Sequence, residues 1–182
     1  MSLRNAFLLA ASLCLISACE KIDLEEENGD SDAEHIVPHT VGMGTQEAPY
    51  TVEQLLQGDI STGQEAWVIG YIVGSTYRSM SNAIFSGRTT YTGNILISYD
   101  SLCSSENKCI AVELASTSIQ KRLSLASDST HYRKCVAVNG TIGRYFNRVG
   151  LREAKEGYLL PGIDLQAIDP RPTDWEEIEN KY

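Results

Sequence analysis

The chain has few of the residues, and none of the short motifs, on which many enzyme active sites are built. It contains three histidines, His35, His39 and His131, and all three lie in polar segments with nothing to orient them. No Gly-x-Ser-x-Gly turn, phosphate-binding loop or dinucleotide fingerprint occurs. No paired cysteines or histidines have the spacing of a zinc site. We therefore expect no catalytic residue, no metal and no cofactor, and a protein that is not an enzyme.

Positive charge is also scarce, with 15 lysines and arginines against 24 aspartates and glutamates. The acidic excess lies in residues 19–44 and 164–182, whereas residues 45–163 are close to neutral. A domain without net positive charge lacks the usual electrostatic footprint of a nucleic-acid-binding protein. Nucleic acid is therefore the less favoured partner.

Long apolar runs are missing too. The run from Ala6 to Ile16 is too short for a transmembrane anchor, which needs ~20 apolar residues. It follows Arg4 and gives way to the small residues 17–18 and then Cys19. This is the layout of a secretory signal rather than of a membrane-spanning helix.

The residues Ile16-Ser17-Ala18-Cys19 resemble the lipobox of bacterial lipoproteins. The resemblance implies that residues 1–18 are a signal peptide and that fatty acid such as palmitate is attached to Cys19, which anchors the protein in a membrane. Residues 19–48 are charged and have no apolar period, so we expect a disordered acidic tether. Acidic residues so close to the lipidated cysteine resemble the export signal of surface lipoproteins in Bacteroidetes. We therefore expect an outer-membrane lipoprotein of the cell envelope, facing the periplasm or displayed at the surface.

Three cysteines follow Cys19, and two arrangements are open for them. Cys103 and Cys109 bracket a polar loop between two apolar runs. In a compartment that permits disulfides, a bridge between them would close a loop of about seven residues and stabilise the fold by roughly 2–2.5 kcal/mol. The alternative is three free thiols, with Cys135 buried as a small apolar residue.

Apolar runs rich in β-branched residues predict a domain of short strands. Ahead of them, Thr51-Val52-Glu53-Gln54 fits a capping box and predicts a short helix that ends at Gly58. A second helix is expected from Thr117 to Ala126, and residues 173–182 of the acidic tail can form a short docking helix. The strands are expected at Trp67–Gly74, Asn94–Tyr99, Cys109–Leu114, Cys135–Ile142 and Val149–Lys155.

The order strand, strand, strand, helix, strand, strand is that of the OB fold, a five-stranded Greek-key barrel. Gly70 and Gly140 lie inside two of these strands within the shared pattern Val-x-Gly-x-Ile. Glycine weakens a strand but lets it bend at a barrel corner. We therefore expect a mainly β, OB-like barrel over residues 49–163, with an irregular β-sandwich of the same strands as the alternative.

Several segments resemble an uncharacterised OB-like domain that recurs in lipoproteins and cell-surface proteins of Bacteroidetes. The resemblance covers roughly residues 49–155 and is most specific at Gly70-Tyr71-Ile72-Val73-Gly74. That domain has no established activity, so the resemblance implies no catalytic residue. The long loop Thr76–Gly93 and the acidic tail depart from its pattern and leave the ligand open. The other similar segments are Pro49–Val52, Trp67–Ile69, Asn94–Ile97, Cys109–Leu114, Val138–Ile142 and Tyr145-Phe146.

Candidate binding residues lie in two connections of the expected barrel. OB proteins often bind through the loop after the first strand and the loop between the last two. Both connections combine arginine with aromatic residues, and a guanidinium beside an aromatic face suits a sugar ring, a base or a peptide equally. The alternative is that the aromatic pair of the second connection only seals the end of the barrel. The candidates are Arg78, Arg88, Arg144, Tyr145, Phe146 and Arg148.

These features predict a lipid-anchored binding module whose partner is a glycan or another envelope protein. A nucleic-acid-binding domain and a purely structural subunit are the alternatives. Nucleic acid requires the candidate arginines to converge on one groove. A glycan requires exposed aromatic rings beside a shallow cleft. The oligomeric state does not follow from the sequence.

Lipid attachment can be tested on native protein purified from membranes. We expect the mass spectrum of the N-terminal peptide to begin at Cys19 and to include fatty acid, because the lipobox resemblance implies both cleavage and acylation there. The variant Cys19→Ala removes the acceptor thiol, so it should leave the membrane fraction. An N-terminal peptide without fatty acid contradicts the prediction.

Overall fold

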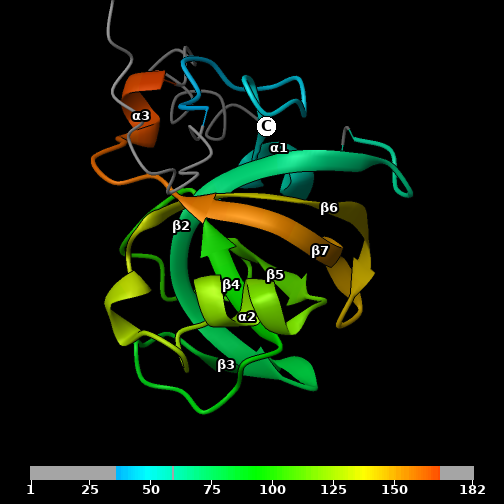
Figure 1. The fold of residues 1–182 in the computed structure, drawn as a ribbon. Helices are drawn as coiled ribbons and strands as arrows, with labels where there is room; N and C mark the ends of the chain where they lie inside the picture. The colour runs from blue at the N-terminus through cyan, green and yellow to red at the C-terminus, as the bar shows by residue number, and fades with distance from the viewer. Residues whose placement is uncertain (1–35, 59, 169–182) are drawn as a thin grey trace, which may run out of the picture. The chain divides into compact units, whose positions relative to one another are not determined.

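The computed structural model describes residues 36–58 and 60–168, and this part of the chain is mainly β (Figure 1). The signal, with the helix expected over residues 3–17, lies outside these residues, as do most of the tether and the end of the tail. The elements are β1 (Tyr50–Thr51), α1 (Val52–Gln57), β2 (Glu65–Tyr77), β3 (Ser79–Ile84), β4 (Asn94–Ser98), β5 (Cys109–Leu114), α2 (Thr117–Leu123), a 3-10 turn (Ser129–His131), β6 (Cys135–Tyr145), β7 (Arg148–Leu159) and α3 (Leu165–Ile168).

The strands β2, β4, β5, β7 and β6 form a closed ring. Antiparallel pairing joins β2 to β4, β4 to β5, and β7 to β6, whereas β5 and β7 run parallel. The ring closes because β2 also pairs with β6, from Glu65 opposite Thr141 to Tyr71 opposite Cys135. Figure 1 shows β2 curving around the ring. The mainly β class is therefore confirmed, and the five ring strands correspond to the five expected strands, with β1 and β3 in addition.

The long strand β2 serves both halves of the ring because it changes partners along its length. Its first half pairs with β6, and its second half pairs with β4 and then with β3. The register with β4 shifts between Ile72 and Gly74. Such irregularities bend a strand and increase its twist. The irregularity in β2 therefore lies a few residues beyond Gly70, the position expected from the sequence.

The two glycines singled out in the sequence lie in paired strands where another backbone comes close. A Cβ on Gly70 would lie 3.0 Å from the Ser98 carbonyl oxygen of β4. A Cβ on Gly140 would lie 2.7 Å from the Arg152 carbonyl oxygen of β7. The β6–β7 register shifts between Asn139 and Thr141, on either side of Gly140. Close approach at these positions therefore explains both glycines.

Capping hydrogen bonds and the backbone conformation of the flanking residues determine where the helices begin and end. The Thr51 amide donates to Gln54 Oε1 at 2.9 Å and the Gln54 amide donates to Thr51 Oγ1 at 3.3 Å, which confirms the capping box. Gly58 ends α1 in the left-handed region, with φ 82°. α2 ends at Leu123 rather than at Ala126, because Ser124 is extended. No helix in the described part of the chain is long and apolar enough to span a membrane.

Alternate side chains of the ring strands enter different apolar clusters, as expected for strands buried on both faces. On β4, Ile95 and Ile97 join the main cluster, which also contains Val52 and Leu55 of α1 and Ile119 and Leu123 of α2. Leu96 joins a second cluster on the opposite face of the strand. The faces of this sheet are therefore largely covered by the chain's own residues. The second cluster also contains Val73, Met80, Cys103, Cys109 and Ala111.

The domain extends upstream of the boundary expected at residue 48. The Gly42 amide donates to the Pro49 carbonyl at 2.8 Å, and the Trp67 amide donates to the Gly44 carbonyl at 2.9 Å. The Tyr158 hydroxyl donates to the Ile36 carbonyl at 2.8 Å. Residues 36–48 are therefore attached to β2 and β7, which corrects their assignment to the tether.

Two elements differ from the sequence expectations. β3 (Ser79–Ile84) lies inside the segment expected to be the loop Thr76–Gly93, and β7 runs on to Leu159 rather than ending at Lys155. At the start of the acidic tail, Leu165 of α3 is buried and its amide donates to the Tyr71 hydroxyl at 3.1 Å. The first residues of the tail are therefore docked on the domain.

The close approach at Gly140 leads to a stability prediction. The variant Gly140→Ala places its methyl group against the Arg152 carbonyl and the Leu151 side chain. We expect this overpacking to lower the free energy of unfolding by about 1–3 kcal/mol. Gly143→Ala on the same strand is the control, because a Cβ there meets nothing within 4 Å. It should change stability by no more than about 0.5 kcal/mol. Urea denaturation of the full chain measures both, and equal effects contradict the prediction.

Candidate functional site

The second predicted binding connection is a tight turn of two residues. Tyr145 at the end of β6 pairs with Arg148 at the start of β7. The residues between them, Phe146 and Asn147, have φ values of 48° and 64°. Positive φ at both central positions is the pattern of a type I′ hairpin turn. The segment is therefore a hairpin tip and not an extended binding loop.

The aromatic pair of this turn packs on the fold. The Tyr145 and Phe146 rings lie 4.0 Å apart between centroids, and both contact the cluster that contains Leu96 and Met80. Burial is the main cause that raises the pKa of the Tyr145 hydroxyl above its ordinary value. The pair therefore covers apolar side chains rather than offering free ring faces to a ligand.

The arginines at this end of the ring are not brought together as a site. The Arg148 guanidinium donates to the Glu106 carbonyl at 3.1 Å and to Asn107 Oδ1 at 2.7 Å, and it lies 3.5 Å from the Glu106 carboxylate. The Arg148 side chain therefore binds the connection between β4 and β5. Arg144 is exposed on β6, opposite Val149.

The first predicted connection contains a stack of side chains at the end of β2. The Tyr77 and Tyr91 rings are stacked, with centroids 4.7 Å apart and planes within 5°. The Arg78 guanidinium carbon lies 4.7 Å from the centroid of the Tyr77 ring. Tyr77 is 40% exposed, so part of this stack remains open to solvent.

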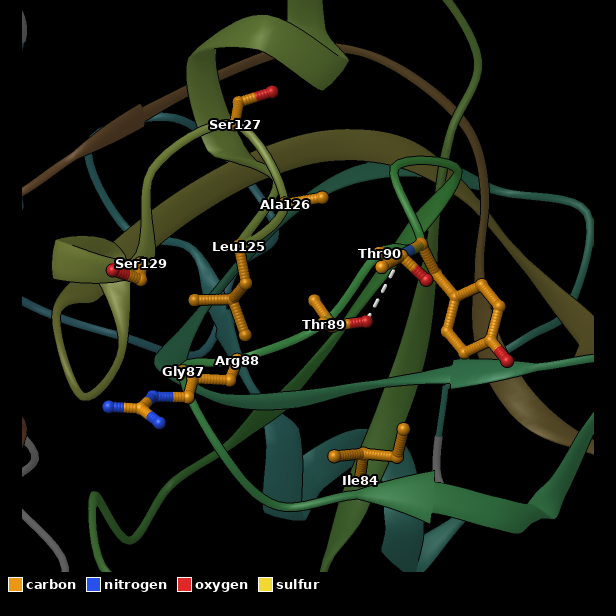
Figure 2. Close-up of a pocket in the computed structure, with 10 residues that line it drawn as sticks. Ile84, Gly87, Arg88, Thr89, Thr90, Leu125, Ala126, Ser127 and Ser129 are labelled. Atoms are coloured by element: carbon orange, nitrogen blue, oxygen red, sulfur yellow. Dashed lines mark hydrogen bonds between the residues drawn. The ribbon is translucent and has the colours of Figure 1, made fainter.

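Beside this stack lies a hollow of about 660 Å³, which we call the Arg88 pocket (Figure 2). Ile84 and residues 87–91 form one wall, and residues 125–127 with Ser129 form the other. The first wall comes from the connection between β3 and β4, and the second from the connection after α2. Of the predicted site residues, only Arg88 lines this pocket, and Arg78 lies near it through the Tyr77–Tyr91 stack.

Hydrogen bonds hold both walls of the Arg88 pocket in place. Thr89 Oγ1 accepts a hydrogen bond from Ser75 Oγ of β2 at 2.8 Å and another from the Tyr91 amide at 3.1 Å; Figure 2 draws the second. On the other wall, Ser124 Oγ donates to Ser127 Oγ at 2.9 Å. The pocket is therefore preformed, which lowers the cost of ordering its walls when a ligand binds.

The lining of the pocket suits a polar ligand that also has an apolar face. Thr90, Tyr91 and Ser129 provide hydroxyl groups, Arg88 provides a cation, and Ile84, which is 37% exposed, provides apolar surface. No histidine, cysteine or carboxylate is among the lining residues. The lining therefore holds no acid–base pair of the kind that hydrolytic chemistry uses.

One titratable pair lies next to the pocket without lining it. His131 Nε2 is 3.5 Å from Asp128 Oδ2, and His131 Nδ1 is buried without a hydrogen-bond partner among the described residues. Hydrogen bonds from Thr130 are the main cause that lowers the pKa of Asp128. Both residues belong to the 3-10 turn or cap it. Within residues 36–58 and 60–168, no three His, Cys, Asp or Glu side chains gather as a metal site.

Residues 50–159, which include all the ring strands and both walls of the Arg88 pocket, match the family described as "Domain of unknown function (DUF6359)". The chain belongs to this family. The resemblance to an uncharacterised domain is confirmed to that extent. No curated protein matches the chain. Among solved structures, the hypothetical protein YgiW from E. coli is similar over 60% of this chain and 87% of its own, with 13% identity and a TM-score of 0.37.

Sequence reasoning missed the second wall of the pocket in the DUF6359 domain. Leu125, Ser127 and Ser129 follow α2, and the first of them was expected to lie within the helix. The available signal was the polar run from Ser127 to Thr130, which is typical of a turn. That run shows where a connection lies but not which distant loop it faces.

The cysteines of the DUF6359 domain take the second of the two arrangements that the sequence left open. Cys103, Cys109 and Cys135 are buried free thiols. Cys103 and Cys109 belong to the same apolar cluster, but the Cys103 thiol donates to the Ser105 carbonyl at 3.4 Å instead of forming a bridge. Burial raises the pKa of the Cys109 and Cys135 thiols to about 12.

These thiols should resist alkylation while the protein is folded. With a pKa of about 12, roughly one thiol in ten thousand is ionised at pH 8, and the thiolate is the reactive form. We expect iodoacetamide, added without reductant, to label Cys109 and Cys135 slowly in native protein. In denaturant it should label these two and Cys103 completely. Peptide mass spectrometry measures the labelling, and a linked Cys103–Cys109 peptide contradicts the assignment of free thiols.

Proposed function

We propose that the DUF6359 domain is an OB-type binding module, without enzymatic activity, that takes a glycan in the Arg88 pocket. The ring order β2, β4, β5, β7, β6, with β5 and β7 parallel, supports the OB assignment. The position of α2 between β5 and β6 supports it further. OB domains bind oligosaccharides and oligonucleotides through sheet faces and the loops beside them.

The usual OB binding face is not available in this chain. By position, the second and third OB strands are β4 and β5. Leu96 and Ala111 on these strands are buried in one cluster with Met80 of β3. Because β3 and its neighbours already fill that face, a ligand needs another place. The Arg88 pocket, at the connection that contains β3, is the place that we propose.

A preformed pocket that combines hydroxyl groups with an aromatic side chain is the observation that carries the proposal. Sugars bind by hydrogen bonds from their hydroxyl groups and by packing of their apolar ring faces, and small-ligand sites usually combine the two kinds of contact. Thr90 and Ser129 offer the first, and Ile84 and Tyr91 offer the second. The hollow is wide and open to solvent rather than enclosed, so a sugar would lie along its surface.

The arginines favour a glycan over nucleic acid. A single-strand-binding groove requires cations that follow a backbone beside stacking rings. Here Arg148 is paired with Glu106, whereas Arg88 lines a pocket that contains neither residue. The other stacking candidates, Tyr145 and Phe146, pack on the fold. Nucleic acid therefore receives less support.

A protein partner also receives less support. The most exposed large apolar side chains are Met43 at 71% and Leu102 at 65%. They belong to the segment before β1 and the connection after β4, and neither lines the pocket. We further propose that the module is anchored through lipid on Cys19 in the cell envelope, which would place the pocket where envelope or external glycans occur.

Glycan binding can be tested with the full chain, solubilised in detergent, on a glycan array. We expect a bound subset whose affinity falls about tenfold or more in Tyr91→Ala, because stacking on an aromatic ring contributes about 1–3 kcal/mol. Tyr91→Phe keeps the ring and should retain most of the affinity, which separates ring packing from loss of the hydroxyl. Isothermal titration with the best-bound glycan measures all three proteins.

A thermal unfolding curve for Tyr91→Ala controls for damage to the Tyr77–Tyr91 stack. If no glycan on the array binds, the proposal fails. If single-stranded DNA binds instead, in a way that weakens steeply with salt and is unaffected by Tyr91→Ala, the nucleic-acid alternative replaces it.

A further inference from the structure

The lining of the Arg88 pocket carries positive charge and no negative charge. Arg88 is the only charged residue that lines it, and every other lining residue is uncharged. Sugar hydroxyl groups can donate as well as accept, but a guanidinium only donates. The guanidinium N–H groups of Arg88 are therefore the strongest hydrogen-bond donors in the pocket. The acceptor that binds such donors most strongly is an anion.

The Arg88 guanidinium differs from several other arginines because it has no partner within the described part of the chain. Arg148 and Arg152 lie against glutamates. Arg78 and Arg133 lie over tyrosine rings. For Arg88, the hydrogen bond that the structure gives involves its backbone amide, which donates to Ser86 Oγ at 3.1 Å. Its five N–H donors remain available for a ligand.

The nearest acid along the second wall does not compete for this cation. Asp128 lies between Ser127 and Ser129 but does not line the pocket. Its Oδ1 accepts from the Thr130 amide at 2.8 Å, and its Oδ2 lies 3.5 Å from His131 Nε2. Both carboxylate oxygens are therefore engaged within their own turn.

A second cation lies near the opposite end of the first wall. Tyr91 lines the pocket and stacks on Tyr77, and Arg78 lies over the Tyr77 ring. In Figure 2 the Arg88 side chain extends toward the side on which Ser129 lies and away from Thr90. The two stacked rings therefore separate Arg78 from the pocket, and of these two arginines Arg88 is the one that lines it.

We infer that the ligand of the Arg88 pocket is an acidic glycan, in which a carboxylate or sulfate group on a sugar ring pairs with the Arg88 guanidinium. The inference rests on the proposed glycan-binding function. The planar guanidinium presents parallel N–H groups that match the two oxygens of such an anion. The hydroxyl groups of Thr90 and Ser129 bind the ring hydroxyl groups, and the exposed side chain of Ile84 contacts an apolar edge of the ring.

The test compares glycans that differ in charge alone. The full chain is titrated with oligogalacturonate and with the same oligomer fully methyl-esterified, which keeps the ring and removes the charge. A sulfated and a neutral galactan oligosaccharide form a second pair that separates sulfate from carboxylate. We expect at least one acidic member to bind more tightly than its neutral counterpart, and its affinity to fall as salt rises.

Three variants assign the charge preference to one residue. Arg88→Gln should lower affinity for the acidic glycan by about tenfold to a hundredfold, because hydrogen bonds to charged groups contribute about 1.5–3 kcal/mol. Arg88→Lys keeps the positive charge but not the planar guanidinium, so its affinity should lie between that of the wild type and that of Arg88→Gln. Arg144→Gln is the matched control, because Arg144 is an exposed arginine outside the pocket. It should bind like the wild type.

The outcomes separate this inference from the proposal on which it rests. Neutral and acidic members that bind equally, with affinity lost in Tyr91→Ala but kept in Arg88→Gln, overturn the acidic ligand and leave glycan binding intact. Acidic glycans that bind equally to Arg88→Gln and the wild type also overturn it. If neither these oligosaccharides nor any glycan on the array binds, glycan binding itself fails.

Discussion

The pairing of β2 with β6 is the constraint on which the rest of this structure depends. It joins the first ring strand to a strand that lies more than sixty residues later in the chain, and it closes the sheet into a ring. Closure removes the exposed edges that an open sheet would leave unpaired. It also fixes the direction in which β2 leaves the ring, and this direction decides where β3 and the connection that contains Arg88 lie.

The covered sheet faces have a consequence for function. Since β3 and the β4–β5 connection supply Met80 and Cys103 to the cluster over Leu96, the face that OB domains commonly use is closed by the chain itself. We therefore propose the binding site beside β3, where the connection after α2 provides the second wall of the Arg88 pocket. The segment formed by β3 and the connection after it therefore covers one face of the sheet and also forms one wall of the Arg88 pocket.

Local sequence signals predicted the parts of the fold that depend on local chemistry. The capping box at Thr51 and Gln54 appeared as expected, because its hydrogen bonds join residues three apart. β4 and β5 also appeared, because β-branched runs suit a buried sheet. β3 was missed because Ser79-Met80-Ser81-Asn82-Ala83-Ile84 has little strand propensity of its own. Its pairing with β2 makes it a strand.

The sequence by itself determined the mainly β class, the strand order and the choice of an arginine-containing loop after the first long strand. Only the tertiary structure decided which candidates remain free to bind. Tyr145, Phe146 and Arg148 are used for packing and ion pairing, whereas Arg88 was placed opposite Ser129. The physical reason is range. Propensity and capping act within a few residues, whereas the pocket needs contacts between segments about forty residues apart in the chain, such as the hydrogen bond from the Tyr132 hydroxyl to the Phe85 carbonyl at 3.3 Å.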